Sequence, residues 1–424
     1  MWSDLPTLTE GGYLPAHGRQ VIPLATNDSM TRFVPHITVL LLSLAAASCR
    51  QSLDVDRPGN TAADSDWIWK ESTPGSAITP GFDSTNNVIY AVSGNRELLA
   101  LRAHTGEELW RRKYGNGFPN GENIAVAGEV VAVGDVDVLG FRASTGQILW
   151  HLSRLEGAEG TRTIPTDGTT FFVAGHDGLV QRLAAHNASV LWSVRLLTAD
   201  TALLAFGPTL INSTLFVCGV NLRSAPFTGS LFALEAATGA LLWRYDYTPA
   251  LPGQSSKCFS RVARSGDLVF SAQDDGRIFA HDYATGAVRW VAPRIHSPPG
   301  DPSGPGTGPY DDRRLLAANA ERVVVSSDDG TVVCYAARTG AELWRTRGSG
   351  AALDPPALAP NLAIISHSGF AVAYDLTSGT ALWTRPNLDL PSEDFTRFHG
   401  QPVIVGDTLY LTGFTGTRAR LLKR

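Results

Sequence analysis

The sequence has few of the residues, and none of the short motifs, that usually mark redox, metal or hydrolytic chemistry. Its 4 cysteines form no Cys-x-x-Cys pair, and none of its 10 histidines lies in a His-Glu-x-x-His motif. The phosphate-binding Gly-x-x-x-x-Gly-Lys-Ser/Thr loop and the Gly-x-Ser-x-Gly turn are also missing. We therefore predict that the protein is not an enzyme and has no catalytic, cofactor-binding or metal-binding residues.

Charge of one sign and long apolar runs are also scarce. The chain has 35 lysines and arginines against 40 aspartates and glutamates, a formal net charge of −5, and no basic stripe. We expect no nucleic-acid partner, because such proteins usually carry a clustered basic surface. The apolar stretch from Ile37 to Ala47 is too short to cross a bilayer as a helix.

The start of the chain has the layout of a secretory signal. Its only methionines are Met1 and Met30, and Met30 is followed by Arg32 and then by the apolar stretch. We interpret residues 1–29 as an upstream extension and residues 30–48 as a signal peptide.

Small residues stand directly before Cys49 and resemble the lipobox of bacterial lipoproteins, although Ala46 replaces the usual leucine. This resemblance implies that Cys49 carries lipid and that residues 49–66 form the anchor and a flexible tether. Arg50 is not the aspartate that retains such proteins at the inner membrane. We therefore expect a protein anchored on the periplasmic side of the envelope, at the outer membrane rather than the inner one. An ordinary secretory signal is the alternative.

Tryptophan, by contrast, is frequent and regularly spaced. Most copies close the phrase Thr/Ser-Gly-x-x-x-Trp, and a period of about 40–50 residues is typical of β-propeller blades. The tryptophans of the series are Trp69, Trp110, Trp150, Trp192, Trp243, Trp290, Trp344 and Trp383. The glycines of the phrase are Gly106, Gly146, Gly239, Gly286, Gly340 and Gly379. We predict that these residues are structural, with each indole wedged between neighbouring blades.

One repeat contains several short strands. Residues 322–327 form a β-branched run, Asp329-Gly330 gives a turn, and residues 331–336 form a second run. A Trp-bearing strand follows, and a weaker apolar run precedes each hairpin, as at residues 123–127. The repeat therefore predicts four antiparallel strands, and we interpret its Asp-Gly pairs as hairpin turns rather than calcium loops.

These units predict an all-β fold, an eight-bladed β-propeller over residues 67–424. A single four-stranded sheet cannot bury both faces, whereas a ring of sheets can. The last segment lacks a Trp strand and the first, Trp67–Trp69, has nothing else. We therefore expect the last blade to be closed by strands from both termini.

The repeated phrase resembles the pyrroloquinoline-quinone (PQQ)-like propeller family from about Trp67 to the C-terminus. Within that group, a ring of this size behind a lipobox resembles the BamB family of outer-membrane assembly lipoproteins. The resemblance implies a monomeric, non-catalytic scaffold that binds an envelope or outer-membrane assembly protein. Quinoprotein dehydrogenases of the group hold PQQ with adjacent cysteines, calcium and an acidic base. No two cysteines are adjacent here, so PQQ is implied by the resemblance alone. A PQQ-dependent oxidoreductase and a surface carbohydrate-binding or small-ligand-binding propeller are the alternatives.

In the BamB family, leucines and an arginine of one mid-chain loop and acidic residues of the next bind the partner. The motif does not match residue by residue, and the corresponding region here begins with Arg195 and continues to Asp246. The candidate partner-binding residues are Leu196, Leu203, Leu204 and Tyr247. The alternative is that the leucines are ordinary strand core.

Two further features leave alternatives open. Cys218 and Cys258 are the only plausible disulfide pair, and the alternative is that they and Cys334 are buried free thiols. A Pro/Gly-rich insertion at residues 295–312 could bind a partner or be tolerated loop length.

Overall fold

The computed structural model divides the chain into two compact units, Met1–Gly59 and Asn60–Arg424. The structure describes residues of the second unit only: 67–71, 78–115, 123–134, 137–152, 163–175, 178–196, 203–221, 227–250, 252, 255–258, 261–292, 314–327, 329–348, 352, 354–367, 370–386, 400–413 and 416–421. The predicted extension, signal peptide, lipidated Cys49 and tether, and the 295–312 insertion, lie outside these residues.

The described residues form eight antiparallel sheets, of which seven have four strands and one has three. Sheets 1 to 4 are β2 (Gly81–Asp83), β3 (Val88–Val92), β4 (Glu97–Arg102) and β5 (Glu108–Lys113); β6 (Ile124–Ala127), β7 (Val130–Gly134), β8 (Val138–Arg142) and β9 (Ile148–Leu152); β10 (Thr170–Ala174), β11 (Leu179–Ala184) and β12 (Val190–Arg195); and β13 (Leu203–Ile211), β14 (Thr214–Asn221), β15 (Thr228–Glu235) and β16 (Leu241–Asp246). Sheets 5 to 8 are β17 (Ala263–Ser265), β18 (Leu268–Ala272), β19 (Ile278–Asp282) and β20 (Val288–Ala292); β21 (Arg314–Ala318), β22 (Arg322–Ser327), β23 (Thr331–Ala336) and β24 (Glu342–Arg347); β25 (Ala357–Ala359), β26 (Leu362–His367), β27 (Phe370–Asp375) and β28 (Ala381–Pro386); and β29 (Val403–Val405), β30 (Thr408–Gly413), β31 (Gly416–Leu421) and β1 (Trp67–Glu71). The prediction of an all-β chain built from four-stranded antiparallel sheets is confirmed for seven of the eight.

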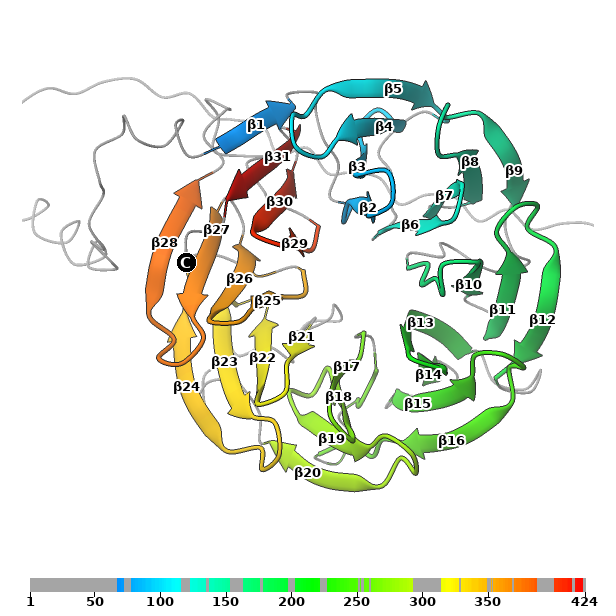
Figure 1. Cartoon of the computed structure of the whole chain (residues 1–424). Helices are drawn as coiled ribbons and strands as arrows, with labels where there is room; N and C mark the ends of the chain where they lie inside the picture. Colours follow the sequence, from blue (N-terminus) through cyan, green and yellow to red (C-terminus); the bar gives the residue numbers. More distant parts are fainter. Residues whose placement is uncertain are drawn as a thin grey trace, which may run out of the picture. The chain divides into compact units, whose positions relative to one another are not determined.

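Within this unit the sheets follow one another around a common centre, with the first strand of each sheet innermost and the Trp-bearing strand outermost (Figure 1). In the four-stranded sheets the second strand is buried on both faces, as the uniformly buried β7 and β18 show. Eight clusters of buried apolar residues account for this, because each cluster draws on two neighbouring sheets. A sheet that is apolar on both faces is stable only when it has a neighbour on each side.

Sheet 8 combines strands from both ends of the described chain. Its order is β1-β31-β30-β29, and Trp69 of β1 stands opposite Ala419 of β31. One of the buried apolar clusters joins this sheet to sheet 1, since Trp69 and Tyr410 pack with Ile89 and Leu101. The Trp-bearing strand that the C-terminal segment lacks is therefore supplied by β1.

Sheet 3 departs from the predicted four strands. Before β10 the described residues, which begin at Thr163, make a single bridge, between Thr166 and Phe171, and no further strand. Pro165 has no N–H to donate and offers only its carbonyl, which accepts a bond from Phe172 N at 3.0 Å. Asp167 Oδ1 then accepts hydrogen bonds from the backbone N–H groups of Thr169 and Thr170, and these bonds hold the segment as a turn.

Seven of the eight tryptophans of the series contact the next sheet through the indole N–H. Seven indole Nε1–H groups donate to a carbonyl of the next sheet at 2.7–3.0 Å. The indoles are those of Trp69, Trp110, Trp150, Trp192, Trp243, Trp290 and Trp344. Six of these acceptors stand three residues before the turn glycine of their repeat, and the seventh, Ala185, stands three residues before Ala188. Buried polar groups need such partners, so the repeat places both an apolar ring and a satisfied donor between sheets.

The turn keeps this shape even where its glycine is lost. The six repeat glycines have φ between 68° and 77°, and a Cβ on any of them would collide with the preceding indole. In the copy after Trp150, Ala188 takes the same place with a φ of 56°. Because Trp150 still donates to Ala185 O at 2.7 Å, the inter-sheet contact persists where the sequence phrase does not.

We expect Gly286→Ala to destabilise the protein by about 2–4 kcal/mol, because two costs add. Its φ of +74° is unfavourable for alanine, and the new Cβ would lie 2.5 Å from Trp243 Cε3. Gly266→Ala is the matched control, since Gly266 has a φ of +57° but no atom within 4 Å of an added Cβ. That variant should lose only about 1 kcal/mol. Urea unfolding measures both, and equal losses would mean that the wedge contact adds nothing.

Candidate partner-binding face

The predicted partner-binding region lies where the outermost strands of sheets 3 and 4 end. Arg195 and Asp246 each stand three residues after the tryptophan of their strand, so the repeat puts them in equivalent places. Both are exposed. The Asp246 side chain is 61% exposed and its Oδ1 lies 2.6 Å from Arg244 Nε. The two strand ends therefore present charged side chains to solvent at equivalent positions of neighbouring sheets.

The candidate leucines are placed differently from one another. Leu196 follows β12, donates its backbone N–H to Gly178 O at 3.0 Å, and is half-buried against the apolar cluster between sheets 3 and 4. Leu203 and Leu204 begin β13, where they stand opposite Asn221 and Val220 of β14. Their side chains lie outside what the structure describes. The Leu196 side chain therefore packs partly against the core and is partly accessible to a partner.

Tyr247 belongs to the core rather than to the surface. It is 2% exposed, and its hydroxyl lies 2.6 Å from Ser271 Oγ and 3.2 Å from His281 Nε2. Burial lowers the pKa of His281 to about 4, so the ring is neutral at pH 7. Its Nδ1 then carries the proton and donates to Gly286 O at 3.1 Å, which leaves Nε2 as an acceptor facing Tyr247. The sequence did not reveal this burial, and Tyr247 offers a partner no accessible side-chain surface.

A disulfide bond links sheet 4 to the segment that leads into sheet 5. Cys218 of β14 and Cys258 form a disulfide with a Cα–Cα distance of 5.2 Å, whereas Cys334 is a buried free cysteine. In the same segment, the backbone N–H of Lys257 donates a hydrogen bond to Asp274 Oδ1 at 2.6 Å. The structure thus decides between the two alternatives that the cysteine positions left open.

Polar side chains also join inner segments of sheets that are not neighbours. Arg261 precedes β17 of sheet 5, and its Nη1 donates to Oε1 of Gln401 at 3.3 Å, just before β29 of sheet 8. Gln401 in turn donates its backbone N–H to Thr79 Oγ1 at 2.9 Å and its Nε2 to Pro356 O at 3.3 Å. Nothing in the repeat pattern predicts these bonds, because Arg261 and Gln401 are 140 positions apart.

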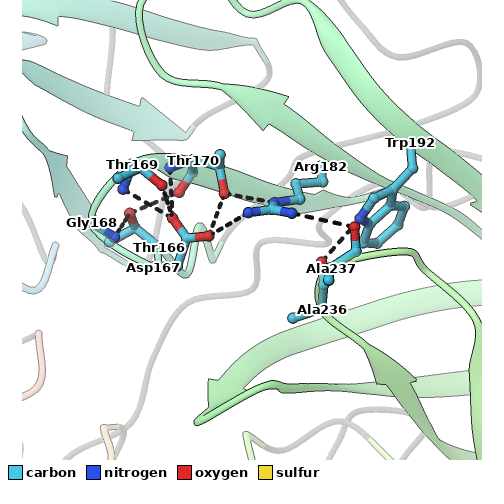
Figure 2. Close-up of polar contacts among 9 residues, drawn as sticks. All are labelled: Thr166, Asp167, Gly168, Thr169, Thr170, Arg182, Trp192, Ala236 and Ala237. Atoms are coloured by element: carbon cyan, nitrogen blue, oxygen red, sulfur yellow. Dashed lines mark hydrogen bonds and ion pairs between the residues drawn. The ribbon is translucent and has the colours of Figure 1, made fainter.

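A second polar cluster braces sheets 3 and 4 from the turn side (Figure 2). Arg182 Nη2 lies 2.8 Å from Asp167 Oδ2, and its Nη1 donates to Ala237 O at 3.3 Å. Burial alone would raise the pKa of Asp167, but hydrogen bonds from Thr169 and Thr170 outweigh it and lower the pKa to about 2. Each of these groups already has a protein partner, so the cluster serves as an inter-sheet brace.

The described residues do not fit a calcium-supported quinone. Among them there is no group of three His, Cys, Asp or Glu side chains that could hold a metal ion. Protein-bound calcium takes oxygen ligands, and clustered carboxylates usually supply several of them. We therefore derive no chemistry through a quinone cofactor. Over the same residues, no helix is long and apolar enough to cross a membrane.

Comparison with known proteins places this architecture in a family. A family model described as "Outer membrane protein assembly factor BamB" matches residues 60–219, 134–307 and 303–422. The outer membrane protein assembly factor BamB of Shewanella oneidensis is 22% identical over 228 residues, which are 51% of this chain and only 53% of that relative. The chain thus spans about half the length of this curated relative.

Solved structures share the fold at low sequence identity. BamB from Moraxella catarrhalis matches with a TM-score of 0.63 and 15% identity, over 83% of this chain and 98% of that one. Quinohemoprotein alcohol dehydrogenase from Comamonas testosteroni matches with a TM-score of 0.62 and 15% identity, over 85% and 77%. Assembly factors and dehydrogenases therefore both use this fold.

Proposed function

Because this chain belongs to the family described as outer membrane protein assembly factor BamB, we propose that it is a non-catalytic, protein-binding scaffold of the bacterial cell envelope that takes part in outer-membrane protein assembly. The family match across residues 60–422 is the observation that carries this proposal. We further infer that the eight sheets are the blades of one propeller whose last blade is closed by β1.

A rigid scaffold fits a binding role. The indole wedges, the Asp167–Arg182 brace and the disulfide hold neighbouring sheets in fixed positions, so strand ends that carry charged or apolar side chains are presented in a constant geometry. Such preorganisation lowers the entropic cost of binding. Arg195, Leu196 and Asp246 are the side chains at these strand ends that we assign to partner contact.

The lipid anchor belongs to the same proposal. Lipid on Cys49, cleavage of residues 1–48 and a tether to residue 66 would hold the scaffold close to the periplasmic side of the outer membrane, where a weak partner gains from high effective concentration. The intact mass of the membrane-extracted protein tests this. A mature chain that starts before Cys49, or an unmodified Cys49, would contradict it.

We expect Arg195→Glu to reduce recovery of the outer-membrane assembly machinery from crosslinked membranes by about tenfold, because it reverses a charge at the contact. Arg347→Glu is the matched control, since Arg347 is also exposed and stands three residues after its tryptophan in β24. Both variants should unfold at the wild-type temperature. Equal recovery for Arg195→Glu and Arg347→Glu would remove Arg195 from the contact.

A PQQ-dependent oxidoreductase is the second candidate, favoured by the fold shared with a quinohemoprotein dehydrogenase. Adding the quinone and calcium to purified protein distinguishes the two functions. A saturable quinone spectrum, together with failure of the wild type to recover any assembly component, would overturn the scaffold proposal. A bound sugar in place of a quinone would point instead to a surface ligand-binding module.

A further inference from the structure

The outermost strands are not equivalent in the residues that precede their tryptophan. In sheets 3 and 4 both preceding residues are exposed aliphatics, Val190 and Leu191 at 52% each, and Leu241 and Leu242 at 56% and 53%. Sheet 2 contributes Ile148 at 43%. We call these five residues the apolar rim.

The same positions elsewhere carry charge or a single aliphatic residue. Glu108 of sheet 1 and Glu342 of sheet 6 stand two residues before the tryptophan, and Arg289 of sheet 5 stands directly before it. Sheets 7 and 8 expose one aliphatic residue each, Leu382 and Ile68. Because the repeat makes these positions equivalent, the comparison shows that exposed aliphatic pairs occur in sheets 3 and 4 alone among the described sheets, beside the exposed Ile148 of sheet 2.

The apolar rim spans three consecutive sheets. Its residues lie on β9, β12 and β16, the outermost strands of three consecutive sheets (Figure 1). Buried clusters join sheet 2 to sheet 3 and sheet 3 to sheet 4, so the three strands keep fixed relative positions. The residues directly before the apolar pairs, Ser189 and Ala240, are uncharged.

The backbone at the rim is unsuited to pairing with another strand. A register shift interrupts the ladder opposite Leu191, between Arg182 and Leu183, and another opposite Leu242, between Ala233 and Leu234. Bulges of this kind protect sheet edges from strand addition. An occupant of the rim must therefore be held by side-chain contacts.

The area of the rim limits what can bind there. Together, five aliphatic side chains that are each about half exposed present on the order of a few hundred Å², whereas a stable pair of subunits buries about 800 Å² on each partner. A second copy of this chain would therefore need contacts beyond the rim. A short apolar segment of another chain would not.

We propose that the apolar rim binds short apolar segments of unfolded, barrel-forming outer-membrane polypeptides. This rests on the proposed function in outer-membrane protein assembly. Transmembrane β-strands place an apolar residue at every second position of segments of about ten residues. Exposed aliphatic residues on three consecutive sheets offer such segments several weak contacts, while the bulges keep the bound chain from pairing with the propeller's own strands.

The test uses the full chain and a purified outer-membrane barrel protein, labelled with a fluorophore and diluted from urea. The wild type should bind the diluted polypeptide and suppress its light scattering, and the double variant Leu191→Asp/Leu242→Asp should weaken binding by about tenfold or more. Leu343→Asp is the matched control, because Leu343 stands directly before Trp344 and is 48% exposed but lies outside the rim. Its binding should equal that of the wild type.

Several outcomes overturn the proposal. Wild-type protein that fails to bind, a double variant that binds as well as the wild type, or an equal loss in Leu343→Asp would each do so. A wild-type dimer in sedimentation that the double variant converts to monomer would assign the rim to a second copy. The double variant should still recover the assembly machinery as the wild type does, so that failure of the rim is distinguishable from failure of the scaffold function.

Discussion

Replacing Trp69 with alanine is expected to lower the free energy of unfolding by about 3–5 kcal/mol, as for other large aromatic residues removed from a packed site. Trp69 is 8% exposed, and its indole covers Gly106 of sheet 1 and donates to Ala103 O at 2.7 Å. Its ring centre lies 6.1 Å from that of Tyr410. The side chain thus connects β1, the N-terminal strand of sheet 8, to the first sheet of the chain.

Two further variants separate the effect of the packed indole ring from the effects of its hydrogen bond and of the strand itself. Ile68→Ala changes the neighbouring residue of the same strand, which is 43% exposed, and should cost less than about 1 kcal/mol. Trp69→Phe removes the donor but leaves Ala103 O bonded to the Tyr410 hydroxyl at 3.2 Å, so it should lose about half as much as the alanine variant or less. Urea unfolding followed by fluorescence measures all three. Wild-type stability in Trp69→Ala would show that the wedge between sheets 8 and 1 is dispensable.

Removing the disulfide is expected to lower the free energy of unfolding by about 4 kcal/mol in the chain-entropy account, because the bond closes a loop with a sequence separation of 40. The double variant Cys218→Ala/Cys258→Ala should unfold at lower urea than the oxidised wild type. It should also be insensitive to reductant, whereas the wild type in reductant should fall to the same level.

Cys334→Ala provides the control for this experiment. Cys334 is buried and free, so its removal should leave the response to reductant unchanged. A reductant response that disappears in Cys334→Ala, or that persists in the double variant, would contradict the assigned pairing. The measurement also tests how strongly sheet 4 depends on its connection to sheet 5.

Much of the fold could be predicted from local features of the chain. The hairpin of β22 and β23 and its Asp329-Gly330 turn appear in the sequence as two β-branched runs around a residue that accepts positive φ. The tryptophans were recognisable as wedges because an indole repeated once per blade must serve the contact that every blade repeats. Both inferences needed only strand period, turn chemistry and recurrence.

The candidate site was less predictable, because its features depend on which distant residues meet. Tyr247 looked like a surface aromatic beside Asp246, yet it is buried against Ser271 and His281 of the next sheet. The apolar rim was missed as well, although a comparison of the residues before each tryptophan would have shown its uncharged pairs. Such a comparison becomes informative only when those positions are known to be exposed.

The sequence by itself determined that this chain is a series of short antiparallel strands with a Trp–Gly contact in each repeat, since both follow from local periodicity and from the conformational freedom of glycine. Only the tertiary structure decided that sheet 3 has three strands among the described residues, that Cys218 pairs with Cys258, and that Arg261 reaches Gln401. The reason is physical. A strand or a turn is specified by neighbouring residues, whereas these contacts join residues far apart in the chain, and their partners are set by how the sheets pack.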